Sequence, residues 1–168
     1  MTQEAPDIEP RTGRRTLALR LASASPRRSL LLREHGFEHV AVPAPVDDSD
    51  LSPGCGTLVE WTAALAYLKA RSARDAMTPE ERAALAALGA DTIVIKAGEA
   101  MGKPVDASDA ERMLRRLSDG SHEVASGVCV LTPDAPRLIF ADIARVRVGA
   151  LSEDQIGEYL ASGGWRGK

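Results

Sequence analysis

The chain has 168 residues, a length typical of one domain, and 44% of them are hydrophobic while 27% are charged. This composition excludes a disordered chain, a collagen-like fibre and a coiled coil, and no apolar stretch reaches the roughly 18 residues that cross a bilayer. The formal net charge of −3 gives no bulk attraction to nucleic acid or to an anionic membrane, so we expect neither as a partner.

The first 15 residues are polar and lack the apolar segment of a secretory signal. They predict a disordered extension over residues 1–15, followed by one folded domain over residues 16–168. The two cysteines, Cys55 and Cys129, support neither a disulfide framework nor a zinc site. We therefore expect a cytoplasmic protein.

Strands and helices alternate in the first part of this domain. Leu17–Ser23 predicts a strand, and Ser25-Pro26 then begins a helix that ends at Gly36, because serine caps helices and proline favours their first turn. Phe37–Val42 predicts a second strand. Thr57 opens a long helix with capping-box spacing. Its buried positions, spaced by three and four residues, are predicted to be Leu58, Trp61, Leu65 and Leu68.

A second capping box at Thr78 predicts a short helix that ends at Gly89, followed by a brief strand over Thr92–Ile95. After a turn at Gly102–Pro104, Asp106 begins a further helix. The inward positions of that helix are predicted to be Ala110, Met113, Leu114 and Leu117.

Two longer strands, Val124–Leu131 and Leu138–Val148, predict an antiparallel pair, because only a short turn containing proline separates them. A last helix begins at Ser152. The order of these elements predicts one α/β domain with a mixed sheet.

The segment Leu21–Arg28 carries the clearest chemical signal. It leaves a strand, passes through small residues and enters a helix with Arg27 and Arg28 in its first turn. The N-terminal end of a helix attracts anions and disfavours cations, so two arginines there fit a phosphate cradle. An ordinary capped helix with solvated arginines fits the local sequence equally well, and both interpretations stay open.

Three other residues have both a functional and a plain interpretation. Asp91, at the start of an apolar strand, is either a turn former or a carboxylate that binds metal or activates water. Lys103, in a tight turn, is either a phosphate ligand or a surface lysine. Lys69 either binds phosphate or complements the C-terminal end of its helix. His122, which precedes a strand, is predicted to be a structural hydrogen-bonding residue rather than a general base.

Motifs of several common hydrolases are missing from the sequence. There is no GxSxG, HExxH or GxxxxGK[ST]. Serine hydrolase, zincin and P-loop chemistry are therefore not supported.

Six segments, in the family's own order, resemble the Maf family of nucleoside triphosphate pyrophosphatases. They are LASASPRRSLL at Leu21–Leu31, LAYLKA at Leu65–Ala70, GADTIV at Gly89–Val94, GKP at Gly102–Pro104, LSDGSHEVASGV at Leu117–Val128 and LSEDQIGEYLASG at Leu151–Gly163. The resemblance implies the α/β Maf/Ham1 fold, similar to that of inosine triphosphatase, in which helices flank a mixed twisted sheet.

The resemblance also implies hydrolysis of a nucleoside triphosphate between its α and β phosphates, with Mg²⁺ or Mn²⁺ as cofactor and a house-cleaning role. It implies that Asp91 is the catalytic residue that activates water, and that Asp48 and Asp91 bind the metal. The implied substrate-binding residues are Ser23, Arg27, Arg28, Lys69, Thr92 and Lys103. The Asp-Thr pair resembles the dTTP/UTP branch of the family, and modified nucleotides are a further implied substrate class.

Relatives continue past the lysine that matches Lys168 with Ala-Gly-x-Tyr, so the chain resembles a family member truncated at its C-terminus. The alternative function is therefore a catalytically impaired Maf-like protein that binds nucleotide or regulates septum formation and cell division. Because relatives often form homodimers, a homodimer is a further expectation. With two phenylalanines, two tyrosines and two tryptophans, the chain has too few aromatic residues for an oligonucleotide-stacking surface.

Overall fold

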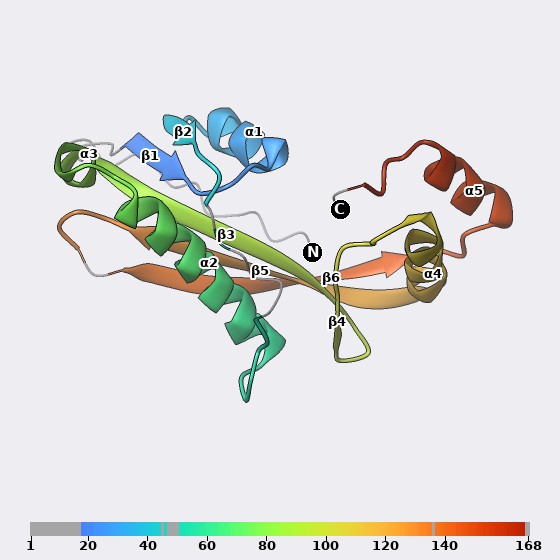
Figure 1. The fold of residues 1–168 in the computed structure, drawn as a ribbon. Coiled ribbons are helices and arrows are strands. Elements are labelled where there is room, and N and C mark those ends of the chain that lie inside the picture. Colours follow the sequence, from blue (N-terminus) through green and yellow to red (C-terminus); the bar gives the residue numbers. More distant parts are fainter. Residues whose placement is uncertain (1–17, 45, 47–50, 136, 167–168) are drawn as a thin grey trace, which may run out of the picture.

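The computed structural model describes residues 18–44, 46, 51–135 and 137–166. Within these residues six strands form one mixed sheet in the order β2-β1-β3-β5-β6, with β4 paired to β3, and five helices flank it (Figure 1). The predicted fold class is thereby confirmed. The predicted extension over residues 1–15 and the candidate metal ligand Asp48 lie outside the described residues.

The first elements form a parallel β–α–β unit. Strand β1 (Ala18–Leu21) pairs with β2 (His39–Ala41), and helix α1 (Pro26–Glu34) connects them. The helix begins after Ser25 as predicted, although the Ser25 side chain makes no capping hydrogen bond. Gly36 follows the helix with a φ of 75°, a left-handed conformation that suits glycine and ends α1 where the sequence indicated.

Helix α2 (Leu58–Asp75) opens with the predicted capping box, in which the Thr57 hydroxyl accepts from the Glu60 N–H and the Glu60 carboxylate accepts from the Thr57 N–H. Its predicted buried face is only partly right. Leu65 is buried, but the other three predicted positions are half-buried. The remaining buried residues of α2 are small: Thr62, Ala66, Ala70 and Ala73.

The helix predicted to run from Thr78 to Gly89 is wrong in its second half. Helix α3 covers only Pro79–Ala84, and strand β3 (Leu85–Lys96) begins at the next residue. Residues 85–88 pair with β1 on one side, and residues 87–89 pair with β5 on the other. These two ladders override the helix propensity of the alanines and leucines in this segment.

The second half of β3 turns back in a hairpin that the sequence analysis did not predict. Strand β4 (Glu99–Met101) pairs antiparallel with β3 through the two-residue turn Ala97-Gly98. Both turn residues have positive φ, 53° and 79°, as a tight hairpin of this length requires.

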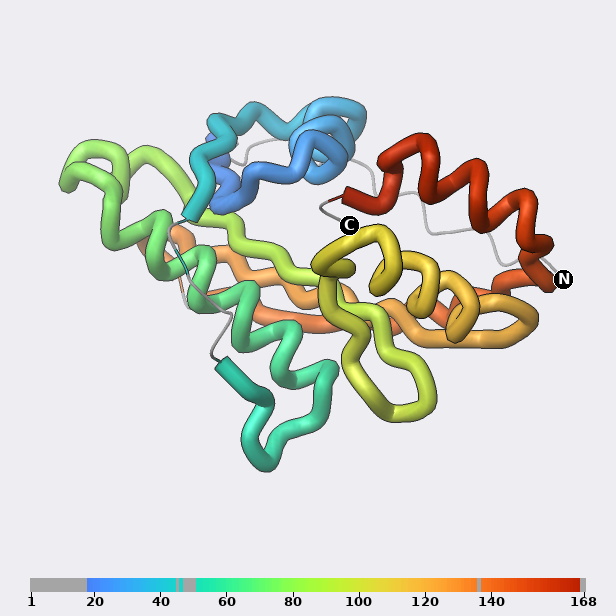
Figure 2. Tube along the Cα trace, turned by 45° about the vertical axis from the view of Figure 1, so that its right-hand side comes forward, coloured from blue at the N-terminus to red at the C-terminus, as the bar shows by residue number. Residues whose placement is uncertain are grey.

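The order of the remaining strands and helices agrees with the sequence. Strands β5 (Gly120–Leu131) and β6 (Leu138–Val148) form the predicted antiparallel pair, although β5 begins at Gly120 and not at the predicted Val124. Helix α4 (Ala107–Leu117) is capped by Asp106, and α5 (Glu153–Ala161) follows β6. The two helices lie together at one end of the sheet (Figure 2).

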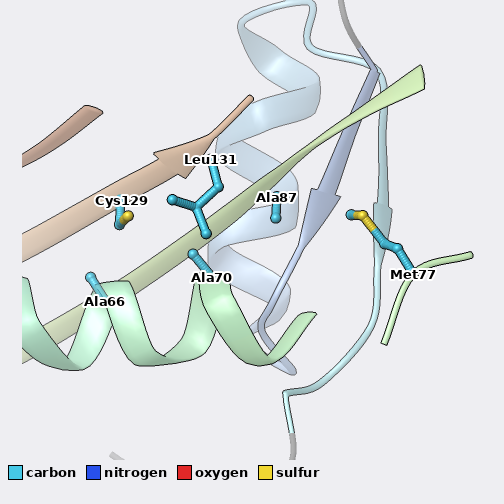
Figure 3. Packing of buried hydrophobic residues seen from close by; sticks show 6 residues of the cluster. All are labelled: Ala66, Ala70, Met77, Ala87, Cys129 and Leu131. Atoms are coloured by element: carbon cyan, nitrogen blue, oxygen red, sulfur yellow. The ribbon is translucent and has the colours of Figure 1, made fainter. Parts of the chain in front are cut away.

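The core lies between α2 and the central strands β3 and β5. Figure 3 shows Ala66 and Ala70 of α2 pointing toward Cys129 and Leu131 of β5, with Ala87 of β3 beside them. Burial raises the pKa of the Cys129 thiol, so this cysteine stays protonated as a small core residue.

Candidate active site

One edge of strand β3 pairs with other strands near both of its ends. Between these paired segments, the edge has no partner strand among the described residues. Residues 85–88 pair with β1 and residues 94–96 pair with β4, on the edge that faces away from β5. The Ala22 N–H donates to the Leu88 carbonyl (2.8 Å), so the main chain of even-numbered residues points toward this edge. Ala90 and Thr92 therefore direct N–H and C=O groups into the opening, where no described residue pairs with them.

An ion pair between α2 and β3 lies at this opening. The Lys69 ammonium Nζ donates to Asp91 Oδ1 at 2.5 Å, and the two side chains are 19% and 13% exposed. Asp91 lies inside β3, so its interpretation as a turn former is wrong. Lys69 lies before the last turn of α2, so its interpretation as a C-terminal dipole partner is also wrong.

Arg28 joins the β1–α1 connection to β3. Its guanidinium donates from Nη1 to Ser23 Oγ (3.3 Å) and from Nη2 to Thr92 Oγ1 (3.3 Å). Ser23 is buried, and its Oγ also accepts from the Ser25 N–H (3.1 Å). Burial lowers the pKa of Arg28, while the negative charge of Asp91 opposes this shift, and the guanidinium stays charged at neutral pH.

The structure thus brings five of the implied site residues to one place, and it leaves two at the margins. Arg27, in α1, and Lys103, after β4, are exposed and form no hydrogen bond or ion pair within the described part of the chain. They belong to the two elements that border the opening, α1 on the β1 side and the β4 hairpin on the other. Lys103 also lines a hollow of about 390 Å³ beside α4.

His122 departs from its predicted role, and two glycines of the site were missed. His122 leaves its Nδ1 buried without a hydrogen-bond partner among the described residues, so its predicted structural hydrogen bond is not formed by that atom. Gly89 and Gly127 lie beside Asp91 where α2 approaches the sheet, whereas the sequence analysis took Gly89 for the end of a helix and gave Gly127 no role. A glycine inside a strand pattern is a signal of close approach, and that signal was available at Gly127.

The donor set limits how a metal ion would bind. In the described ranges no group of three or more His, Cys, Asp or Glu residues is arranged to hold a metal. Asp91 offers one carboxylate at the opening. Mg²⁺ commonly binds one or two carboxylates together with substrate phosphates, so the residues fit an ion that arrives with a phosphate chain.

The site therefore combines two cations, one carboxylate and unpaired main-chain groups along one open strand edge. The chemistry of this set suits a phosphorylated ligand, and the carboxylate is of the type that accepts a proton from water.

None of the helices in the described residues is both long and apolar enough to cross a membrane.

Several known proteins are similar to this chain in sequence. A sequence model of the family described as Maf-like protein matches residues 18–168. The chain is 42% identical over 144 residues to the dTTP/UTP pyrophosphatase of Geobacter sp. (strain M21), covering 85% of this chain and 71% of that protein. It is 39% identical over 143 residues to the dTTP/UTP pyrophosphatase of Aquifex aeolicus (strain VF5), covering 85% and 70%.

A solved structure supports the fold alone. The Staphylococcus aureus Ham1 protein aligns with a TM-score of 0.51 at 14% identity, covering 77% of this chain and 71% of that chain. The likeness confirms the mixed sheet with flanking helices that the sequence predicted.

Proposed function

Because this chain belongs to the Maf family, we propose that it is a nucleoside triphosphate pyrophosphatase that hydrolyses dTTP and UTP to the monophosphate and pyrophosphate. The observation that carries this proposal is the Lys69–Asp91 ion pair at the open edge of β3, beside the Arg28 guanidinium. Removal of surplus or modified nucleotides, a house-cleaning role, follows from such an activity.

Asp91 is the proton acceptor in this proposal. Lys69 holds Oδ1 and leaves Oδ2 to a water molecule. As the water oxygen bonds to the α phosphorus, its proton passes to Asp91, and the bond from that phosphorus to the α–β bridging oxygen breaks. The bonding electrons leave with pyrophosphate. General base catalysis of this kind typically contributes about 10²–10⁴-fold in rate.

The cations of the site balance the charge of the substrate. A nucleoside triphosphate carries about four negative charges, and charge shifts among its oxygens during the transfer. Arg28 and Lys69 lie at the opening, and the exposed Arg27 and Lys103 border it on its two sides. We expect Arg27 and Lys103 to close on the phosphates when substrate binds.

Mg²⁺ or Mn²⁺ is the cofactor of this proposal, with Asp91 and Asp48 as its carboxylate ligands from the protein. When bound, the ion neutralises phosphate charge and polarises the attacked phosphoryl group. The support is the hard oxygen chemistry of the carboxylates.

Pyrophosphate release from a panel of nucleotides tests the function. We expect release from dTTP and UTP with Mg²⁺ or Mn²⁺, slower release from CTP and purine nucleotides, and none with excess chelator. A folded sample that binds dTTP and releases no pyrophosphate with either metal would favour the alternative, a nucleotide-binding regulator.

A further inference from the structure

Helix α2 touches the sheet at two glycines. A Cβ atom built on Gly127 would lie 2.3 Å from the Thr62 carbonyl oxygen and 2.7 Å from the Ala63 nitrogen. One built on Gly89 would lie 2.1 Å from the Ala66 carbonyl oxygen and 2.5 Å from the Ala70 nitrogen. Real Cβ atoms essentially never come closer than 3.0 Å, so the helix backbone occupies the space of two missing side chains.

The two contact points surround the Lys69–Asp91 ion pair. On the sheet, Gly127 is the cross-strand partner of Asp91, and Gly89 precedes Asp91 by two residues and shares its face. On the helix, Lys69 lies within the turn that joins Ala66 to Ala70, the two residues that meet Gly89. The distance between helix and sheet at the glycines therefore sets the distance between Lys69 and Asp91.

We propose that Gly89 and Gly127 are positioning residues for the reaction at Asp91. Their missing side chains let α2 lie close enough to the sheet for Lys69 to hold and orient the Asp91 carboxylate. This inference rests on the proposed pyrophosphatase function, and it concerns how the catalytic geometry is held.

A methyl group at Gly127 fits only if the backbone of α2 moves away from the sheet. The atoms that it meets are helix backbone, and these move only together with the helix. Relief of a 2.3 Å contact needs a displacement of about 1 Å, and a displacement of this size in a catalytic group can lower the rate about 10²-fold.

The first experiment compares Gly127→Ala with Leu131→Ala, assayed well below their melting temperatures. Both substitutions lie in β5, but Leu131 lies at the end of the strand, in the core cluster opposite Ala87 and away from Asp91. We expect both variants to melt earlier than the wild type. Only Gly127→Ala should lose about 10²-fold in kcat, with a much smaller change in KM. An equal loss of kcat in Leu131→Ala, or a normal kcat in Gly127→Ala, would overturn the proposal.

A double-mutant cycle then asks whether the glycine acts through Lys69. Lys69→Met keeps an unbranched side chain out to the Cε position and removes the ammonium. If Gly127 positions Lys69, adding Gly127→Ala to Lys69→Met should lower kcat by no more than about threefold, because the contact is already lost. A full further loss would show that Gly127 serves packing alone and would overturn the inference.

The cycle also separates this inference from the function on which it rests. A wild-type protein that releases no pyrophosphate overturns both. An active wild type in which the two substitutions act independently overturns only the positioning role. Gly157→Ala, at a helix position with open space around it, controls for the alanine itself and should leave kcat unchanged.

Discussion

Asp91 and Lys69 depend on each other, because both are largely withdrawn from water and an unpaired charge at that depth is costly. The carboxylate is held by the ammonium, and Lys69 takes part in a further interaction beyond Asp91. The pair therefore serves both the local fold and the proposed reaction, and substitutions must be chosen to separate the two.

Asp91→Asn makes this separation, because the amide has nearly the shape of the carboxylate and cannot accept the proton of water. We expect kcat for dTTP to fall by about 10²-fold or more, while nucleotide binding survives. Pyrophosphate release gives the rate, and the thermal shift with dTTP gives the binding. Near-normal turnover in a pure sample would remove Asp91 from the mechanism.

Arg28→Ala removes the guanidinium that links Ser23 to Thr92. We expect the stabilisation by saturating dTTP to shrink, because that stabilisation grows with affinity for the folded state. The apo protein should lose about 1.5–3 kcal/mol of unfolding free energy, the range for a hydrogen bond that involves a charged group. Thermal midpoints with and without dTTP measure both effects.

Arg27→Ala is the matched comparison, because Arg27 is exposed and lies one residue away in the same helix turn. Its apo midpoint should equal that of the wild type, and its dTTP-induced shift should also shrink. A full ligand-induced shift in both variants would contradict a phosphate site at the start of α1.

At the scale of elements, two helix starts and one helix stop were predicted correctly because their signals are local. The capping boxes at Thr57 and Thr78 and the stop at Gly36 depend on neighbouring residues alone, and all three are confirmed. The Leu85–Gly89 segment was mistaken for helix because its strand state depends on β1 and β5, which are distant in sequence. Gathering Arg28, Lys69 and Asp91 at one opening likewise required the sheet order.

The capping box of α2 makes the stability depend on pH. The Thr57 N–H and hydroxyl hold the pKa of Glu60 below its ordinary value. A carboxylate with a lowered folded pKa stabilises the protein above its unfolded pKa, near 4.3, and this contribution is lost as the pH falls through the folded pKa. We expect Glu60→Gln to lower the urea midpoint at pH 7 and to make much less difference at pH 3.

Glu158→Gln supplies the control, because Glu158 is exposed on α5 and its carboxylate forms no ion pair with a described residue. Its urea midpoint should follow that of the wild type at both pH values. A Glu60→Gln effect of equal size at pH 3 and pH 7 would show that the capping carboxylate contributes nothing through its charge.

At the scale of the whole molecule, β6 is one of the two outer strands in the order β2-β1-β3-β5-β6 of the described residues. It carries exposed apolar side chains, which are Leu138, Ile139, Phe140, Ile143 and Val146. An outer strand with such side chains is a template for pairing with a second chain. The homodimer expected from the resemblance to relatives remains a prediction that this edge makes testable.

Ile143→Lys tests whether β6 mediates self-association, because a lysine on an edge strand opposes pairing with a second chain. We expect the wild type to associate with rising concentration in sedimentation velocity, and the variant to associate less while kcat stays unchanged. Tyr159→Lys, at another exposed apolar position but on a helix, should associate like the wild type. Identical sedimentation of all three would show that β6 is no association surface.

The open edge of β3 also gives its amide protons an alternating exchange pattern. The N–H groups of Asp91 and Ile93 point toward β5 and are held in its ladder, whereas those of Ala90 and Thr92 point into the opening. In deuterated water, the first two should exchange slowly and the last two rapidly, although all four lie in one continuous strand. Amide spectra of the apo protein and of its complex with a non-hydrolysable dTTP analogue would show whether the nucleotide protects Ala90 and Thr92. Protection of these two amides would mean that the nucleotide completes the sheet where β1 and β4 leave it open.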